Sequence, residues 1–238
     1  MTAAAHASSS EKRQRTTPTA TMRVAAKRGP AAYRALTGCD PADARVETDW
    51  EFDAHVLACI IAVATLEHGP LCERIGLKQS DLSDLIDRWF PHADFDWSDR
   101  ADAASEDDEL AMVRDLLLAN CRPGSEIGRL LACMIARRSM EASHLWEDLG
   151  LRNRDELSRM LKRHFGPLAE RNTRGMRWKR FFYRMLCEDE GFVMCTTPVC
   201  TDCSDFDNCF GVEDGESRLA RRKRDAALEA NPSPKVMV

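Results

Sequence analysis

The chain has 238 residues, of which 44% are hydrophobic, and its 34 Lys and Arg against 39 Asp and Glu give a formal net charge of -5. Such a composition is typical of a soluble globular protein, and its acidic balance excludes a surface built throughout for nucleic acid. The longest apolar run, 56–64, is too short for a membrane span, which takes about 20 residues. We therefore expect neither a membrane nor a nucleic acid as partner.

The N-terminal segment differs in composition from the rest of the chain. Residues 1–45 are rich in Ala, Thr, Ser and Pro and carry eight basic residues, which predicts a disordered basic tail. It has no apolar stretch like that of a secretory signal, so we expect a cytoplasmic protein. Ten cysteines in this length are too few for a disulfide scaffold, which favours reduced thiols or metal ligands.

Helical periodicity begins after the tail. Apolar residues at spacings of three and four predict a buried helix over 49–64. A second helix is predicted over 80–90, with Ser80 as its cap and Pro91 as its stop, followed by an acidic loop over 92–104.

Further helices are predicted from start and stop signals along the second half of the chain. We expect a helix from Ser105 to before Pro123, a helix over 125–135, and a short turn of helix over 144–149 that Gly150 closes. A capping-box-like start at Asn153 and Glu156 predicts a helix that continues to 165 and is broken at Gly166 and Pro167. The last predicted helix covers 173–187.

No segment alternates with the period of two that a half-buried strand requires, so the predicted fold class is all-α. We expect a disordered basic tail over 1–45 and a compact helical domain over 46–192. A cysteine-rich metal-cluster loop over 193–213 and a basic C-terminal helix and tail over 214–238 complete the predicted organisation.

Four cysteines fall within fifteen residues and are the predicted metal ligands: Cys195, Cys200, Cys203 and Cys209. Their spacing is C-x4-C-x2-C-x5-C, and a short loop with four thiols can wrap one small polynuclear centre. Structural zinc usually takes two C-x2-C pairs, and only one is present here. The spacing of the first three cysteines, C-x4-C-x2-C, is shared with plant-type ferredoxins. An iron-sulphur cluster is favoured, with zinc and unmetallated thiols as alternatives.

Charged residues flank the motif on both sides. Three aspartates lie among the ligands, where they either lower the reduction potential of a cluster or are solvated loop acids. Upstream, a row of basic residues could offset the charge of the cluster or guide an oxyanion in, although such a row is usually a solvent-facing side of a helix: Arg174, Arg177, Lys179, Arg180 and Arg184.

Three stretches of this sequence resemble the NifQ family. They are MRWKRFFYRMLCE over 176–188, the cysteine loop with its ending CFGVE over 209–213, and HLWEDLGL over 144–151. The resemblance is densest from about 143 to 215 and covers none of the tail before 45.

This resemblance implies a function. NifQ proteins are soluble nitrogen-fixation factors that carry a molybdenum-iron-sulphur cluster and donate molybdenum for the nitrogenase iron-molybdenum cofactor. Carried over by motif, Cys195, Cys200, Cys203 and Cys209 would bind the cluster. Molybdate, the cofactor-assembly scaffold and the nitrogenase iron protein would be the partners. Such a carrier is not an enzyme, and we expect no catalytic residue.

Histidines and further cysteines are weaker candidates. His144 and His164 could add a molybdenum ligand, but a lone histidine on a helix more often caps or packs, so neither enters the predicted ligand set. Cys187 is expected to pack in the core rather than to serve as a fifth thiolate, and the same holds for Cys59, Cys121 and Cys133.

Two other functions fit the motif without the resemblance. One is an iron-sulphur electron-transfer protein, which would hold iron and sulphide but no molybdenum. The other is a regulator with zinc or an iron-sulphur cluster, in which the basic stretch over 218–224 would contact DNA. No recognition helix is evident beside the cysteines, which weighs against the regulator. The basic stretch is otherwise a solvated helix.

Overall fold

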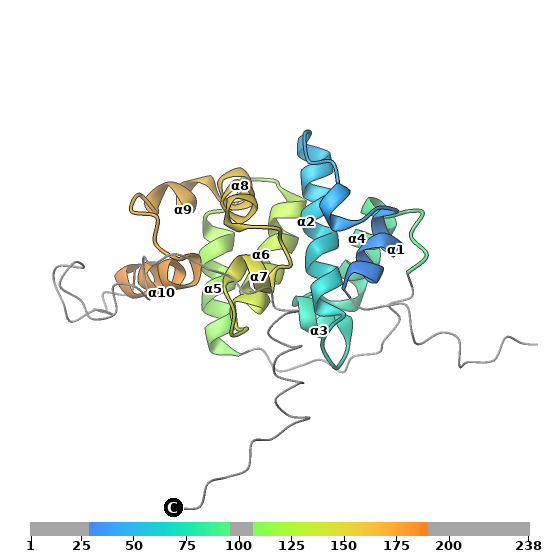
Figure 1. Cartoon of the computed structure of the whole chain (residues 1–238). Coiled ribbons are helices and arrows are strands. Elements are labelled where there is room, and N and C mark those ends of the chain that lie inside the picture. Colours follow the sequence, from blue (N-terminus) through green and yellow to red (C-terminus); the bar gives the residue numbers. More distant parts are fainter. Residues whose placement is uncertain (1–28, 96–106, 190–238) are drawn as a thin grey trace, which may run out of the picture.

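The computed structural model describes residues 29–95 and 107–189, and within these ranges every regular element is a helix (Figure 1), as the all-α class predicts. The elements are α1 (Pro30–Thr37), the 3₁₀ turn η2 (Pro41–Asp43), α2 (Asp49–Ala64), α3 (Leu71–Ile75), α4 (Gln79–Trp89), α5 (Asp108–Ala119), α6 (Glu126–Ser139), α7 (Leu145–Asp148), α8 (Arg154–His164), α9 (Gly166–Arg171) and α10 (Trp178–Asp189). None of these helices is both long and apolar enough to cross a membrane.

Helix α2 is the centre of the domain. It starts with a capping box, in which the Thr48 hydroxyl accepts from the Glu51 N–H at 3.2 Å and Glu51 Oε2 accepts from the Thr48 N–H at 3.0 Å. From His55 to Ala64 every side chain is buried. In Figure 1, α1 and α4 lie on one side of α2 and α5 to α10 on the other, while α3, which contacts both α2 and α6, lies at the lower end of α2. An all-round apolar helix is the pattern expected for a core element.

The prediction of a disordered tail over 1–45 is wrong for residues 29–45. These residues form α1 and η2, and Ala32 and Tyr33 are buried against the core. The Arg152 guanidinium fixes this segment by donating to the carbonyl of Pro41 at 2.9 Å and to that of Ala44 at 2.8 Å. Composition missed the helix because its few apolar residues follow a basic stretch. Residues 1–28 lie outside the described ranges.

Two helix starts differ from the predicted ones. Helix α4 begins at Gln79 after Lys78, whose side chain makes no capping bond, so Ser80 is inside the helix and is not its cap. Helix α5 begins at Asp108, and the Asp107 carboxylate caps it by accepting from the Glu109 N–H at 3.2 Å. The predicted start at Ser105 lies outside the described ranges. Aspartate caps as well as serine does, so sequence alone does not separate them.

Short helices and turns account for the other differences. Helices α3 and α9 were not predicted, because five or six residues are too few to show periodicity, and Pro167 lies in the first turn of α9, where proline is favoured. Helix α10 starts at Trp178 rather than at 173. Before it, the Asn172 side chain bonds the N–H of Met176 at 2.8 Å and its carbonyl at 2.9 Å, which closes a turn.

Other local signals are confirmed. Ser125 caps α6 by accepting from the Gly128 N–H at 3.0 Å. Gly150 ends α7 with a φ of 70°, and a Cβ there would approach the Cys59 carbonyl oxygen of α2 to 2.7 Å. Asn153 caps α8 by accepting from the Glu156 N–H at 3.0 Å, but Glu156 accepts from the Arg152 N–H instead of returning the bond.

A fully buried arginine joins several elements. Arg138 of α6 forms a bidentate pair with Glu67, which follows α2, at 3.0 and 2.9 Å. The same guanidinium donates to the carbonyl of Asp148 in α7 at 2.8 Å and to that of Arg74 in α3 at 3.3 Å. A charge in the core needs such partners, because an unpaired one is costly. These bonds therefore tie α6 to three other parts of the chain.

Polar bonds also connect α2 to α8. Asp53 accepts from Arg163 Nη2 at 2.9 Å and lies 2.9 Å from His164 Nε2. Burial alone would raise the pKa of Asp53, but hydrogen bonds from His164 and Arg163 outweigh it and hold this pKa below its usual value. Two residues further, His55 Nε2 lies 3.3 Å from Glu156, and His55 Nδ1 lies 2.7 Å from the Tyr33 hydroxyl.

Breaking the Arg138 pair should destabilise the domain. We expect Glu67→Gln to lower the free energy of unfolding in urea by about 3–5 kcal/mol, because it removes the bidentate counter-charge of a buried guanidinium and leaves only the more distant Glu141 carboxylate, at 3.8 Å. The matched control is Glu126→Gln, since Glu126 is exposed and pairs with Arg88 on the surface. That change should cost at most about 1 kcal/mol. Equal losses in the two variants would contradict the role assigned to the buried pair.

The Asp53 cluster predicts a pH dependence of stability. Because the folded-state pKa of Asp53 is lowered, its contribution is present above the ordinary aspartate pKa of about 3.9 and is lost as pH falls through the folded-state value. The difference in unfolding free energy between the wild type and Asp53→Asn should therefore be large at pH 7 and shrink towards pH 3. Asp84→Asn, at an exposed position of α4, is the control and should change the unfolding free energy at pH 7 by at most about 0.5 kcal/mol.

Candidate functional site

The four predicted ligands, Cys195, Cys200, Cys203 and Cys209, lie outside the described ranges. The six cysteines inside these ranges have free thiols: Cys39, Cys59, Cys72, Cys121, Cys133 and Cys187. Over 29–95 and 107–189, no three His, Cys, Asp or Glu side chains form a group that could hold a metal ion. The described helices therefore contribute no competing ligand set.

The cysteines on the helices mostly match the predicted packing role. Cys59 is buried in α2, and burial raises the pKa of its thiol, which makes a thiolate there unfavourable. Cys133 and Cys187 are half-buried, so the core covers them only in part. Burial also raises the pKa of the Cys133 thiol.

Helix α10, which precedes the cysteine motif in sequence, is firmly attached to the domain. Trp178 is buried and its indole N–H donates to the Ser158 hydroxyl of α8 at 3.4 Å. Phe181 and Phe182 are also buried, and Trp178 packs edge-on against Phe181 with 5.7 Å between ring centroids. Tyr183 donates from its hydroxyl to Glu109 of α5. The start of α10 is thus fixed against α8 and its middle against α5.

Lys179 contributes a buried ion pair to the same attachment. Its ammonium donates to Asp148 Oδ2 at 2.6 Å and to the Glu141 carbonyl. Burial lowers the pKa of Lys179, and the nearby Asp148 carboxylate opposes this shift only in part. Asp148 is 1% exposed. The basic row over 174–184 is therefore not a uniformly solvated side of a helix, because one member of the row points into the core.

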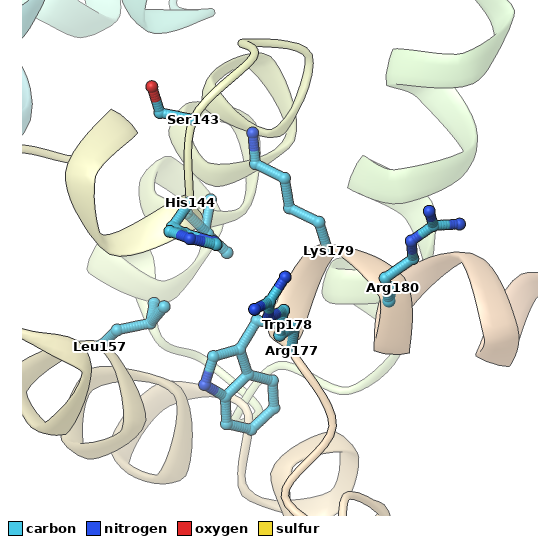
Figure 2. A pocket seen from close by; sticks show the side chains of 8 residues that line it. Ser143, His144, Leu157, Arg177, Trp178, Lys179 and Arg180 are labelled. Atoms are coloured by element: carbon cyan, nitrogen blue, oxygen red, sulfur yellow. The ribbon is translucent and has the colours of Figure 1, made fainter. Parts of the chain in front are cut away.

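A cavity of about 190 Å³ lies at the start of α10, between this helix, α8 and the turn that leads into α7. Figure 2 shows the arrangement: Trp178 and Lys179 leave α10 in opposite directions, and Leu157 lies on the Trp178 side. The residues that line the cavity include no acid: Ser143, His144, Leu145, Leu157, Arg177, Trp178, Lys179 and Arg180.

A second cavity, of about 470 Å³, adjoins the first and shares Lys179 and Arg180 with it. Its lining is of mixed charge, because Asp107, Glu109 and Glu141 also contribute. The basic character is therefore concentrated in the smaller cavity at the start of α10.

The two histidine candidates have different surroundings. His164 is buried against Asp53, so it stabilises the contact between α2 and α8 as the packing interpretation predicts. His144 precedes α7, where its backbone N–H donates to Glu147 Oε2 at 3.1 Å, and its side chain lines the basic cavity. His144 therefore lies at a site, whereas His164 belongs to the fold.

Sequence reasoning missed the inward direction of Lys179 and its partner Asp148. Helical spacing contained the signal, because Lys179 is three residues before the buried Phe182 and therefore shares its side of the helix. The partner could not be inferred in the same way, since Asp148 is 31 residues away in sequence.

The fold and the site together define the class of this protein: an all-helical domain with a basic cavity at the start of its last described helix, and a four-cysteine motif beyond that helix in sequence. The chain belongs to the NifQ family, whose model matches residues 56–211. The match begins within α2 and extends past the last cysteine of the motif.

Relatives support the same assignment. The chain is 42% identical over 179 residues to the NifQ homolog of Sinorhizobium fredii, covering 72% of this chain and 77% of that protein. It is 42% identical over 145 residues to NifQ of Rhodobacter capsulatus, covering 61% and 80%. It is 38% identical over 152 residues to NifQ of Azotobacter vinelandii, covering 58% and 78%. No solved structure matches. Membership of the family is consistent with a role in nitrogen fixation.

The Lys179 pair provides a test of how α10 is attached. Lys179→Met should lower the free energy of unfolding by about 3–5 kcal/mol, because it removes the ammonium that pairs with the buried Asp148 carboxylate. Adding Asp148→Asn should recover part of this loss, since the buried carboxylate charge is then removed as well. The control is Arg184→Met, which breaks the more exposed pair with Glu188 on the same helix and should cost at most about 1 kcal/mol. Additive losses in the double variant would contradict the pairing.

Proposed function

We propose that this protein carries molybdenum in an iron-sulphur cluster and donates it for biosynthesis of the nitrogenase iron-molybdenum cofactor. The observation that carries this proposal is the C-x4-C-x2-C-x5-C motif, Cys195 to Cys209, within a chain of the NifQ family. Thiolates with bridging sulphide suit iron and reduced molybdenum, whereas oxygen ligands suit molybdenum as molybdate. Four thiols in fifteen residues supply the soft ligands for one cluster.

The described helices support this assignment in two ways. They hold no alternative group of metal-ligating side chains, which leaves the cysteine motif as the candidate ligand set. They also fix α10 through Trp178 and Lys179, and α10 ends at Asp189, six residues before Cys195 in sequence. A carrier must release its cargo, which favours ligands on one continuous segment over ligands distributed through a packed core.

The role as a carrier defines the partners. Molybdate is the source of the metal, and the acceptors are the cofactor-assembly scaffold and the nitrogenase iron protein. The protein acts in the cytoplasm, where thiols stay reduced. It transfers a metal and does not turn over a small-molecule substrate, so it is not an enzyme.

Metal analysis tests the proposal. Full-length protein is purified without oxygen from cells supplied with molybdate, and its iron, acid-labile sulphide, molybdenum and zinc are measured. Molybdenum together with iron and sulphide supports the carrier. Iron and sulphide without molybdenum would identify an electron-transfer protein instead, and zinc alone would contradict both functions.

Removing one ligand should abolish cluster binding without unfolding the protein. We expect Cys200→Ala to lose iron and molybdenum and to keep the helical circular dichroism of the wild type, because the described core ends at 189. Cys39→Ala is the matched control, since this half-buried thiol lies between α1 and η2 and outside the motif. It should retain both metals. Retention of the cluster by Cys200→Ala would remove this cysteine from the ligand set.

A further inference from the structure

Two tryptophans form a stacked pair on the surface of the domain. The rings of Trp50 in α2 and Trp89 in α4 have centroids 3.9 Å apart and planes inclined by 13°. Trp50 is 53% exposed, whereas Trp89 is half-buried. Because Trp89 covers one face of the Trp50 ring, the exposed area includes the opposite face. A large aromatic side chain left open to solvent is typical of an interaction surface.

Aspartates of α4 continue this surface. Asp81, Asp84 and Asp87 follow one another at intervals of three residues, and none of them is buried. Asp81 and Asp84 line a groove of about 490 Å³ together with Trp89. Within residues 29–95 and 107–189, the three carboxylates have no ion pair or hydrogen bond. We call these three aspartates and the two tryptophans the Trp–Asp surface.

The Trp–Asp surface carries more acids than cations. Arg88 lines the groove of α4 but is paired with Glu126, and Arg129 lines it without an ion pair to either aspartate in the described part of the chain. A second groove, of about 380 Å³, lies beside Trp50 and has two acids and one cation: Asp43, Glu51 and Arg45. An anionic ligand is therefore disfavoured, and a cationic one is favoured.

An open indole face beside carboxylates is suited to arginine. A guanidinium is planar and weakly hydrated, so it stacks on an indole ring while its edge donates parallel N–H groups to a carboxylate. Lysine makes the same contacts less well, because its ammonium is compact and strongly hydrated. The chemistry of the surface therefore fits a segment that contains several arginines.

We infer that the basic stretch over 218–224 of the same chain binds to the Trp–Asp surface. Five of its seven residues are cations, and four of them are arginines: Arg218, Arg221, Arg222, Lys223 and Arg224. The stretch lies outside the described ranges. The six cations of residues 1–28 are spread over a much longer segment, which makes that segment a poorer match.

The length of the connecting chain allows this contact. Residues 190–217 link α10 to the basic stretch, and a linker of roughly 28 residues can extend to about 90 Å. A domain of about 150 residues is only roughly 40 Å across, so the surface lies within reach. Tethering also raises the effective concentration of the stretch, so contacts that are individually weak suffice.

This contact anchors the cysteine motif on both sides. Helix α10 is fixed to the domain and ends before Cys195, and the basic stretch begins nine residues after Cys209. With both ends held, the motif stays beside the domain. The inference goes beyond the proposed function and does not depend on which metal the four thiols bind.

Cross-linking of the full-length protein tests the inference. A mixture of unlabelled and ¹⁵N-labelled chains is treated with a carbodiimide, which joins a lysine amine directly to a neighbouring carboxylate. Mass spectrometry should find Lys223 joined to Asp81, Asp84 or Asp87 within one chain. Lys235, which follows the stretch, is the internal control and should not be joined to α4. Raising the salt concentration should lower the yield severalfold, because exposed ion pairs are screened.

Two variants keep Lys223 and all three aspartates and should still lower the yield of this cross-link about threefold or more. Trp50→Ala removes the stacking surface, and Arg221→Ala combined with Arg222→Ala removes two guanidinium groups. Met112→Ala is the control for the first variant, since Met112 is another exposed apolar residue, at 37%, and lies on α5. Its yield should match that of the wild type. Circular dichroism verifies that the variants are folded.

Four results would overturn the inference. The first is absence of any cross-link between Lys223 and α4, and the second is an unchanged yield in both variants. Cross-links from Lys12 or Lys27 in place of Lys223 would assign the surface to the N-terminal segment. Cross-links only between labelled and unlabelled chains would assign it to a second copy of the protein. None of these results bears on metal content, so the proposed function is tested separately.

Discussion

Burial of the Arg138 guanidinium is the constraint on which the described structure depends. A charge with no solvent exposure must be matched, and Glu67 with two backbone carbonyls provides the match. One of these carbonyls belongs to Asp148, whose side chain holds Lys179. Arg138 and Lys179 therefore share a partner residue. Through this residue the packing of α3 and α6 is coupled to the position of α10.

This coupling explains how the basic cavity forms. Trp178 and Lys179 are used to attach α10, one to α8 and the other to α7. The residues on either side of them, Arg177 and Arg180, then line the cavity beside His144. The same network fixes the opposite wall, because Asp148 closes the short helix that His144 opens. Buried ion pairs thus determine where Arg177 and Arg180 lie.

Sequence predicts the local features of this molecule better than its long-range ones. Helices α2, α6 and α8 follow from apolar periodicity and from caps that are close in sequence, such as Ser125 and Asn153. The pairing of Arg138 with Glu67 spans 71 residues, and arginine is ordinarily a surface residue, so no local pattern indicates it. For the site, His144 and the basic row were identified from the sequence, but the sequence does not show that Arg177, Lys179 and Arg180 line one cavity with His144, which depends on the fold.

The two parts of the chain also differ in how they encode chemistry. The spacing of Cys195, Cys200, Cys203 and Cys209 is local, so it predicts a ligand set without knowledge of the helices. The basic cavity takes His144 from the start of α7 and Arg177 and Arg180 from the start of α10, so it exists only once these elements pack together. The cavity therefore requires the folded domain, whereas the four thiols of the cysteine motif are brought within one short segment by the sequence itself.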